Sequence, residues 1–228
     1  MKLRAVTITG ADDSTFHKDL ETVSQEFPFV EWAIIHSTDD GVPRHPSSEW
    51  RRELSALSAG CSLAAHLEWD FLQRLAVTPA LAEELRSYPR ITFNIFGRHT
   101  EFHREIWPSI STAFIGAEIS IQAGEVDSAV QSLLAEMAAD HTLSVLLDAS
   151  VGRGIVPGEW IAAPSGVVFG FAGGLNPDNI SAELERMAST VGNQTIWIDM
   201  ETGVRTSDDL ALDLSKVRRC LAQAQCYV

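Results

Sequence analysis

The sequence predicts a single (β/α)8 barrel, also called a TIM barrel, that spans residues 1–228 as one domain. Short runs rich in β-branched and apolar residues recur eight times, and helical stretches alternate with them. No linker, low-complexity tract or block of charge divides the 228 residues, a length that suits one barrel. An open, doubly wound sheet has the same local pattern and is the alternative fold, since the two differ only in closure.

Each of these runs is expected to form a strand that ends at or before a polar residue or a glycine. In chain order they are Leu3–Thr9, Val30–His36, Ser62–His66, Ile91–Ile95, Ala117–Gln122, Leu143–Leu147, Val167–Phe171 and Thr195–Asp199. Helices are expected where start signals precede apolar residues at helical spacing. Two helices are expected to begin after Ser14 and at Ser47, and the helical region after the third strand is expected to break near Pro79. Further helices are expected over Glu101–Ser111, Val126–Ala138, Pro177–Thr190 and Asp213–Gln223.

The composition is that of an acidic, globular protein. With 31 acidic against 17 basic residues the net charge is −14, which disfavours nucleic acid and anionic membranes as partners. Three cysteines without paired spacing indicate neither a disulfide framework nor a metal site, and no cofactor motif is present. The first residues do not form a signal peptide, and no apolar run reaches the ~20 residues of a membrane helix, so we expect a cytoplasmic protein. The sequence indicates no oligomeric state.

Polar residues and glycines gather where the expected strands end. In a barrel these carboxyl ends lie on one face, and the loops there build the active site. The residues are Thr9, His36, Arg44, His66, Asn94, Gln122, Asp148, Gly173, Gly174, Asp199, Glu201 and Gly203. They predict a binding site at that face.

Two glycine loops predict where an anion binds. Gly173 and Gly174 leave the seventh strand and precede Asn176 and Pro177, a suitable start for a helix. Gly203 follows the eighth strand. Bare glycines let an anion approach the N–H groups of a helix start, and barrels commonly hold phosphate after strands seven and eight. We therefore expect a small phosphorylated or otherwise anionic ligand.

Several stretches together resemble phosphoribosylanthranilate isomerase of tryptophan biosynthesis. The ending AGGLNPDNI, IDMETGVRTSDDL and LDLSKV is the most specific part. VTITG at the start, GVPRHP around Arg44 and VLLDASVGRG around Asp148 are similar as well. The resemblance implies a barrel that binds a phosphorylated sugar and converts an aminoaldose to an aminoketose. It also implies that Asp148 is the general acid and that Gly173, Gly174 and Gly203 hold phosphate.

Thr9 stands where the resemblance places a catalytic cysteine. An alkyl hydroxyl is far less acidic than a thiol and is a poor base. His36 is the first candidate to replace it, because it ends a strand and titrates near neutrality, and His66 and Asp12 are the others. The alternatives are a different isomerase or lyase step on a related sugar phosphate, and a non-catalytic ligand-binding or regulatory barrel.

Further charged residues lie at the expected site. Arg44 and Arg153 are expected to contact the anionic ligand. Asp199 and Glu201 beside a phosphate loop would repel it, which favours a different substrate, or a metal ion or cationic substrate group between the two acids. His99 and His103 have a spacing that could bind a metal on one helix face, but solvent exposure is the favoured interpretation.

Overall fold

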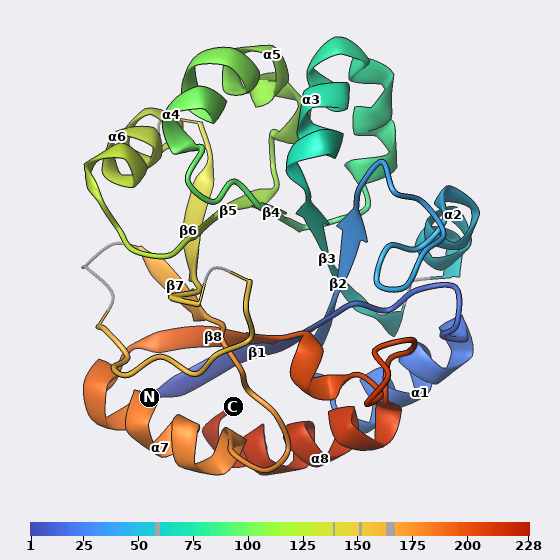
Figure 1. Cartoon of the computed structure of the whole chain (residues 1–228), viewed down its shortest axis with the longest axis vertical. Helices are drawn as coiled ribbons and strands as arrows, with labels where there is room; N and C mark the ends of the chain where they lie inside the picture. The colour runs from blue at the N-terminus through green and yellow to red at the C-terminus, as the bar shows by residue number, and fades with distance from the viewer. Residues whose placement is uncertain (58–59, 139, 151, 163–166) are drawn as a thin grey trace.

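Eight strands close into one barrel in the computed structural model, which describes residues 1–57, 60–138, 140–150, 152–162 and 167–228 (Figure 1). Neighbouring strands pair in parallel all round, and β8 pairs with β1. The strands are β1 (Lys2–Thr9), β2 (Val30–His36), β3 (Ser62–Leu67), β4 (Arg90–Phe93), β5 (Glu118–Ala123), β6 (Thr142–Leu147), β7 (Val168–Phe171) and β8 (Thr195–Met200). Closure confirms the (β/α)8 barrel and excludes the open sheet.

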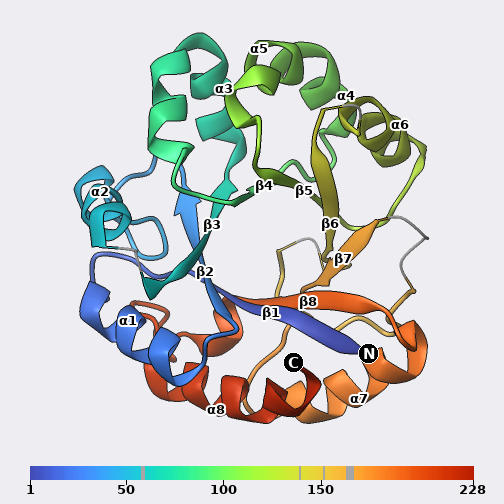
Figure 2. The same cartoon turned by 180° about the vertical axis from the view of Figure 1, so that it is seen from behind.

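Helices surround the barrel, as opposite views show, and the two chain ends lie near α7 and α8 (Figures 1 and 2). The α-helices are α1 (His17–Glu26), α2 (Ser48–Leu57), α3 (Trp69–Val77), α4 (His99–Glu101), α5 (Trp107–Ile110), α6 (Ser128–Met137), α7 (Ile180–Val191) and α8 (Leu214–Ala224). Side-chain caps begin at least three of them: Ser47 accepts from the Trp50 amide, Asp127 from the Val130 amide, and Asp213 from the Ser215 and Lys216 amides.

Two helices differ from the expected pattern. The helix expected over Glu101–Ser111 is divided, because a π-helical segment, Phe102–Ile106, separates α4 from α5. Helix α7 begins at Ile180 instead of Pro177, since Asn176 accepts from the Asp178 amide and forms a turn before the helix. The break expected near Pro79 is present: α3 ends at Val77, and a 3-10 helix, η2 (Pro79–Leu85), begins at Pro79.

The connection from β6 to β7 contains no helix among its described residues. Trp160 covers the barrel there instead. Its ring packs edge-on against Phe171 of β7, with centroids 5.4 Å apart, and its indole N–H donates to Glu183 of α7 at 2.9 Å. The loop that leaves β6 is therefore anchored to β7 and α7 and crosses beside the mouth of the barrel.

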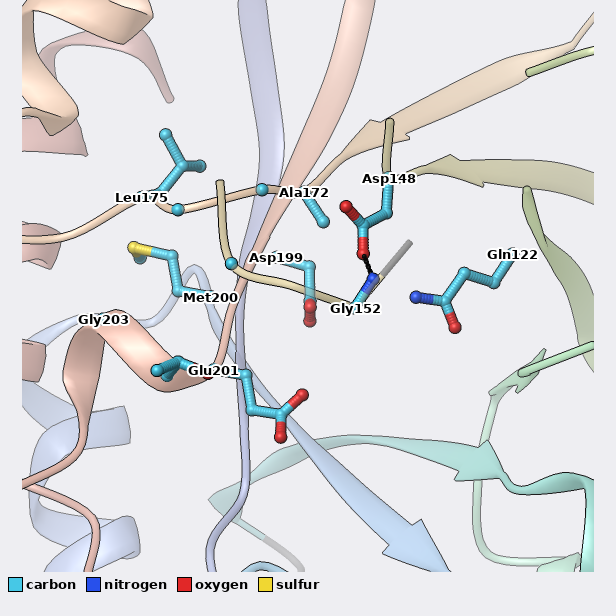
Figure 3. Close-up of a pocket in the computed structure, with 13 residues that line it drawn as sticks. Gln122, Asp148, Gly152, Ala172, Leu175, Asp199, Met200, Glu201 and Gly203 are labelled. Atoms are coloured by element: carbon cyan, nitrogen blue, oxygen red, sulfur yellow. Dashed lines mark hydrogen bonds between the residues drawn. The ribbon is translucent and has the colours of Figure 1, made fainter. Parts of the chain in front are cut away.

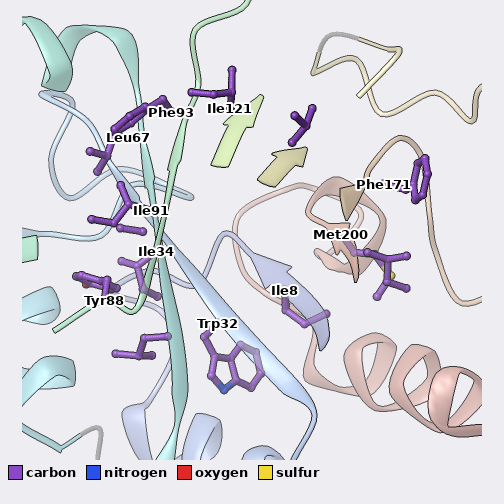
Figure 4. Close-up of a cluster of buried hydrophobic side chains, with 14 of the residues drawn as sticks. Ile8, Trp32, Ile34, Leu67, Tyr88, Ile91, Phe93, Ile121, Phe171 and Met200 are labelled. Carbon is purple, nitrogen blue, oxygen red and sulfur yellow. The ribbon is translucent and has the colours of Figure 1, made fainter. Parts of the chain in front are cut away.

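The main hydrophobic core lies between the outer face of the sheet and the helices. Ile8, Trp32, Ile34, Phe93 and Ile121 are almost fully buried in this layer (Figure 4). Both faces of a closed parallel sheet are covered, so its strands read as nearly continuous apolar runs.

The inside of the barrel is more polar than the layer between the sheet and the helices. Arg90 of β4 donates to Thr7 at 2.8 Å and to Glu31, and its guanidinium carbon lies 3.4 Å from the centroid of the Trp197 ring. A Cβ on Gly170 of β7 would lie 2.1 Å from that ring, so this position must lack a side chain. Trp197 fills the barrel together with Arg90, Thr7 and Glu31, and these side chains form the floor beneath its mouth.

Candidate functional site

The carboxyl ends of the strands surround a small cavity of about 60 Å³ (Figure 3). At ~30 Å³ for each water molecule, its share of the liquid, this is room for about two waters. Its lining comes from the ends of β5 to β8 and the loops that follow them: Gln122, Asp148, Gly152, Gly154, Ala172, Gly173, Gly174, Leu175, Asp199, Met200, Glu201, Thr202 and Gly203. The structure thus brings Asp148, Asp199, Glu201 and the three predicted glycines together.

Asp199 of β8 is a buried carboxyl at the base of this cavity. Thr9 Oγ1 donates a hydrogen bond of 2.7 Å to Asp199 Oδ1. Burial raises the pKa of Asp199 to about 7, although the Thr9 hydrogen bond lowers it. Glu201 and Asp148 add to the rise through their negative charge. Asp199 therefore gains and loses its proton near neutral pH, which suits general acid–base chemistry.

Asp148, one residue after β6, accepts three hydrogen bonds from its own loop. Oδ1 accepts from the Ser150 amide at 3.0 Å and the Ser150 hydroxyl at 2.7 Å, and Oδ2 accepts from the Gly152 amide at 2.7 Å. A carboxylate offers about four acceptor sites, so one on Oδ2 has no partner among the residues that the structure describes. Asp148 shapes the loop and still presents an acceptor to a ligand.

The three predicted glycines lie where neighbouring loops touch backbone to backbone. A Cβ on Gly174 would lie 2.7 Å from the carbonyl oxygen of Gly154, and one on Gly203 would lie 1.9 Å from that of Leu175. Packing therefore requires these glycines whether or not a ligand binds. Their amides remain available, because no described protein group accepts a hydrogen bond from the N–H of Gly173, Gly174 or Gly203.

An ion-pair cluster ties together the loops after β1, β2 and β8. Arg44 pairs with Glu201 and, at 2.6 Å, with Asp209. Arg205 is completely buried and bonds Asp12 at 3.2 Å and Asp209 at 2.8 Å. Asp12 also accepts from the Arg44 amide at 2.7 Å. Glu201, predicted to repel an anion, thus has a cationic partner that offsets its charge.

A wider cavity of about 370 Å³ adjoins the first and shares Gln122, Gly152 and Glu201 with it. Loops after β3 and β4 supply the remaining lining: Glu68, Trp69, Asn94, Phe96 and Arg98. Asn94 Nδ2 donates to Glu68 Oε1 at 2.8 Å, and the Arg98 guanidinium lies over the Trp69 ring, 4.8 Å from its centroid. Together the two cavities form one acidic mouth.

Two predicted residues lie apart from this mouth. His36 faces outward from β2, where its ring packs against Phe71 at 5.2 Å and Tyr88 at 5.3 Å between ring centroids. Burial holds the pKa of His36 well below its usual range, and the charge of Arg51 lowers it further. Arg153 is exposed and donates to the Ser150 carbonyl. The structure does not bring His36 or Arg153 together with Asp148 at the cavity.

The pKa of each of the other two candidate bases lies below neutrality. His66 points into the barrel, where burial and then Arg90 lower its pKa to about 3. It is neutral at physiological pH. Asp12 is engaged by Arg205 and by the Arg44 amide.

Sequence reasoning missed Glu68 and Arg205. The third strand was expected to end at His66, but β3 extends to Leu67, so the first residue after it is Glu68. Arg205 lies inside the stretch ETGVRTSDD, and its position two residues after Gly203 was the available signal.

His99 and His103, which lie one helical turn apart in the sequence, form no metal site with other described residues. His99 is largely buried and contacts the Gln122 carbonyl, whereas His103 pairs with Glu136. The expectation of solvent exposure is therefore wrong for His99. Across the described ranges no group of three His, Cys, Asp or Glu side chains could hold a metal ion. No helix in the described part of the chain has the length and apolar character to cross a bilayer.

A solved structure shares this architecture over nearly the whole chain. It contains monomers generated from the dimeric phosphoribosylanthranilate isomerase of Thermotoga maritima, with a TM-score of 0.59 and 12% sequence identity. The alignment covers 97% of this chain and 98% of that one. The two share a fold. No protein-family model matches the sequence, and no curated protein matches it. The likeness to that barrel, expected from the sequence, is confirmed at the level of the fold, and the chemistry must be argued from the site.

Proposed function

We propose that this barrel binds a small phosphorylated sugar at its mouth and isomerises an aminoaldose to an aminoketose. The observation that carries the proposal is Asp199, a buried carboxyl with a pKa of about 7 that lines one cavity with Asp148 and two glycine loops. Paired carboxyls whose surroundings differ are how enzymes separate the roles of acid and base.

The phosphate end of the ligand would lie at the glycine loops. The free N–H groups of Gly173, Gly174 and Gly203 supply donors there, at the approach to helix α7. Repulsion from the acids is limited, because Arg44 neutralises Glu201 and about half of the Asp199 carboxyls hold a proton at pH 7. The cavity of about 60 Å³ suits an oxyanion, so the sugar would extend into the wider cavity.

The two aspartates would move the protons. Protonated Asp199 donates to the ring oxygen of the sugar, the bond from C1 to that oxygen breaks, and the lone pair of the nitrogen on C1 forms a C=N bond. Asp148 then takes the proton from C2, which gives an enaminol. The enaminol becomes the aminoketose when C1 gains a proton from Asp148 and the hydroxyl on C2 gives its proton to Asp199, so both carboxyls return to their starting states. The resemblance implies that Asp148 is the general acid, whereas here Asp199 is the acid and Asp148 the base. We assign Asp148 as the base because the hydrogen bonds from Ser150 and Gly152 favour it as an acceptor.

Binding is tested with ribose 5-phosphate and ribose as a matched pair of probes. We expect ribose 5-phosphate to shift the NMR amide signals of Gly173, Gly174 and Gly203, and ribose to leave them unchanged. Gly203→Ala should weaken binding of ribose 5-phosphate at least tenfold, because its Cβ would displace the Leu175 carbonyl. Equal responses to the two probes would refute a phosphate site.

Catalysis is tested with phosphoribosylanthranilate, the aminoaldose that names the structurally similar enzyme. Asp199→Asn should lower kcat by about 10²- to 10⁴-fold, the usual contribution of a general acid, while ribose 5-phosphate still binds. If wild type binds ribose 5-phosphate but converts no aminoaldose, the barrel is a binding protein and the catalytic part of the proposal fails.

A further inference from the structure

A third cavity, of about 530 Å³, opens on the outer wall of the barrel between α2 and η2. Helix α2 and the segment from η2 to Ser87 form its sides, and His36 of β2 lies at its inner end. Its lining shares no residue with the two cavities of the mouth. The volume lies within the range of about 300–1,000 Å³ that small-molecule sites occupy.

His36 brings two unpartnered ring nitrogens to this outer-wall cavity. The side chain is completely buried, yet neither Nδ1 nor Nε2 has a hydrogen-bond partner among the described residues. The depressed pKa of His36 keeps the ring neutral at physiological pH, so one nitrogen donates and the other accepts. A hydroxyl group can serve either nitrogen, because it both donates and accepts. Leaving buried polar groups without partners is costly, and a hydroxylated ligand would satisfy them.

Arg51 brings an open edge of its guanidinium to the same cavity, although its side chain is only 7% exposed. Nη1 is occupied, because it donates to the Pro46 carbonyl at 2.6 Å and to Asp40 at 3.3 Å. Nε is buried without a partner in the described part of the chain, and Nη2 makes a long ion pair of 3.9 Å with Glu84. Two neighbouring N–H groups of a guanidinium form a fork that binds a carboxylate through parallel hydrogen bonds.

The acids around the cavity leave this edge of Arg51 open. The other two arginines of the lining have acids of their own, at 2.7 Å and 3.8 Å. Asp40 lies on Nη1, at the other side of the guanidinium. Glu84 is the acid beside Nη2, and 3.9 Å is beyond hydrogen-bonding distance. Because the Glu84 side chain is 42% exposed, a ligand carboxylate can displace it toward solvent.

We propose that the outer-wall cavity is a second ligand site, which binds a hydroxylated carboxylate of the sugar-acid class. The carboxylate lies on the Nε and Nη2 edge of Arg51, and a hydroxyl meets the His36 ring. Ser48, Ser55 and Ser87 add hydroxyl groups to the lining, which suits the remaining hydroxyls of such a ligand. This site is separate from the mouth, so it can be occupied together with the sugar phosphate of the proposed function.

Gluconate, sorbitol and hexanoate test this site, because sorbitol lacks the carboxylate of gluconate and hexanoate lacks its hydroxyls. The full chain is titrated with each, and NMR follows the Arg51 Nε–H group and the His36 ring. We expect gluconate to shift both signals and to bind about tenfold more tightly than sorbitol or hexanoate. Glu84→Gln should strengthen gluconate binding about threefold, because it removes the competing acid. Glu185→Gln, at an exposed position on α7, removes the same charge elsewhere and should leave the affinity unchanged.

The outcomes that would overturn the second site are equally specific. Gluconate may not leave the Arg51 and His36 signals unchanged, and it may not shift only the amides of Gly173, Gly174 and Gly203, since that result places it at the mouth. Sorbitol binding as tightly as gluconate would refute the carboxylate contact, and equally tight hexanoate would refute the hydroxyl contact. Weaker gluconate binding by Glu84→Gln would show that this acid does not compete. None of these results depends on whether ribose 5-phosphate binds at the mouth.

Discussion

Replacing Asp199 with asparagine should stabilise the folded protein, by an amount that grows with pH. Asparagine keeps an oxygen that can accept from Thr9 and removes the group that burial forces to hold its proton. An acid whose pKa is higher in the folded state than in the unfolded state opposes folding once the unfolded state begins to ionise.

The size of the effect follows from the two pKa values. Below the ordinary value of 3.8 both states hold the proton, and Asp199 has no effect on stability. As the pH rises from 3.8 to about 7 the unfolded state loses its proton first, which favours unfolding. Above about 7 both states are ionised, and the cost to the fold reaches its full value of about 4 kcal/mol. Between pH 5.5 and 8.5 this cost grows by about 2 kcal/mol.

Urea unfolding of wild type and Asp199→Asn at pH 5.5, 7 and 8.5 measures this growth. The difference in unfolding free energy between the two proteins should shift in favour of the variant by about 2 kcal/mol across the range. The pH-independent effects of the substitution cancel in this comparison. Asp39→Asn, at an exposed position, controls for the loss of one negative charge. A difference that stays constant, or that moves against the variant as pH rises, would refute the raised pKa of Asp199.

Three further substitutions test the packing that supports the site. Gly170→Ala should destabilise the fold by about 1–3 kcal/mol in urea unfolding, because its Cβ meets the Trp197 ring. Trp197→Leu in the same chain should recover part of the loss. If Gly170→Ala leaves the unfolding free energy unchanged, that contact is contradicted. Arg205→Gln should lower stability by about 3 kcal/mol, since it leaves buried Asp12 without its charged partner, and a loss below about 1 kcal/mol would show that the pair is solvated. Asp127→Ala should cost about 1 kcal/mol by thermal unfolding through loss of the α6 cap, whereas Asp127→Asn should cost little; equal losses would exclude capping as the cause.

The sequence was sufficient for the barrel and for the location of its mouth. Strand ends are marked by abrupt changes from apolar to polar residues, so Asp148, Gly173 and Gly203 were placed correctly on one face. The predicted end of β3, at His66, is one residue early, so the sequence places His66 and not Glu68 beside the mouth.

Side-chain direction was harder to predict than strand position. All residues of β2 are buried, because helices cover one face and the barrel interior the other, so no alternation of polar and apolar residues shows which way His36 points. The structure resolves it: Glu31 bonds Thr7 and Arg90 inside the barrel, and His36, five residues on, faces the helices. The pKa of Asp199 was beyond the sequence for a related reason, since it depends on burial by residues far apart in the chain.

The cluster of Arg44, Glu201, Asp12, Arg205 and Asp209 has a consequence for how the rim of the barrel moves. Arg44, after β2, pairs with Glu201 and Asp209 after β8, and Arg205, after β8, pairs with Asp12 after β1. Asp12 also accepts from the Arg44 amide, so no one of these three loops can open without breaking a bond that holds another. The three loops should therefore behave as a single cooperative unit of local unfolding. Their amide protons should exchange with solvent through one shared opening of the same free energy, and loss of any one bridge would make all three loops exchange faster together.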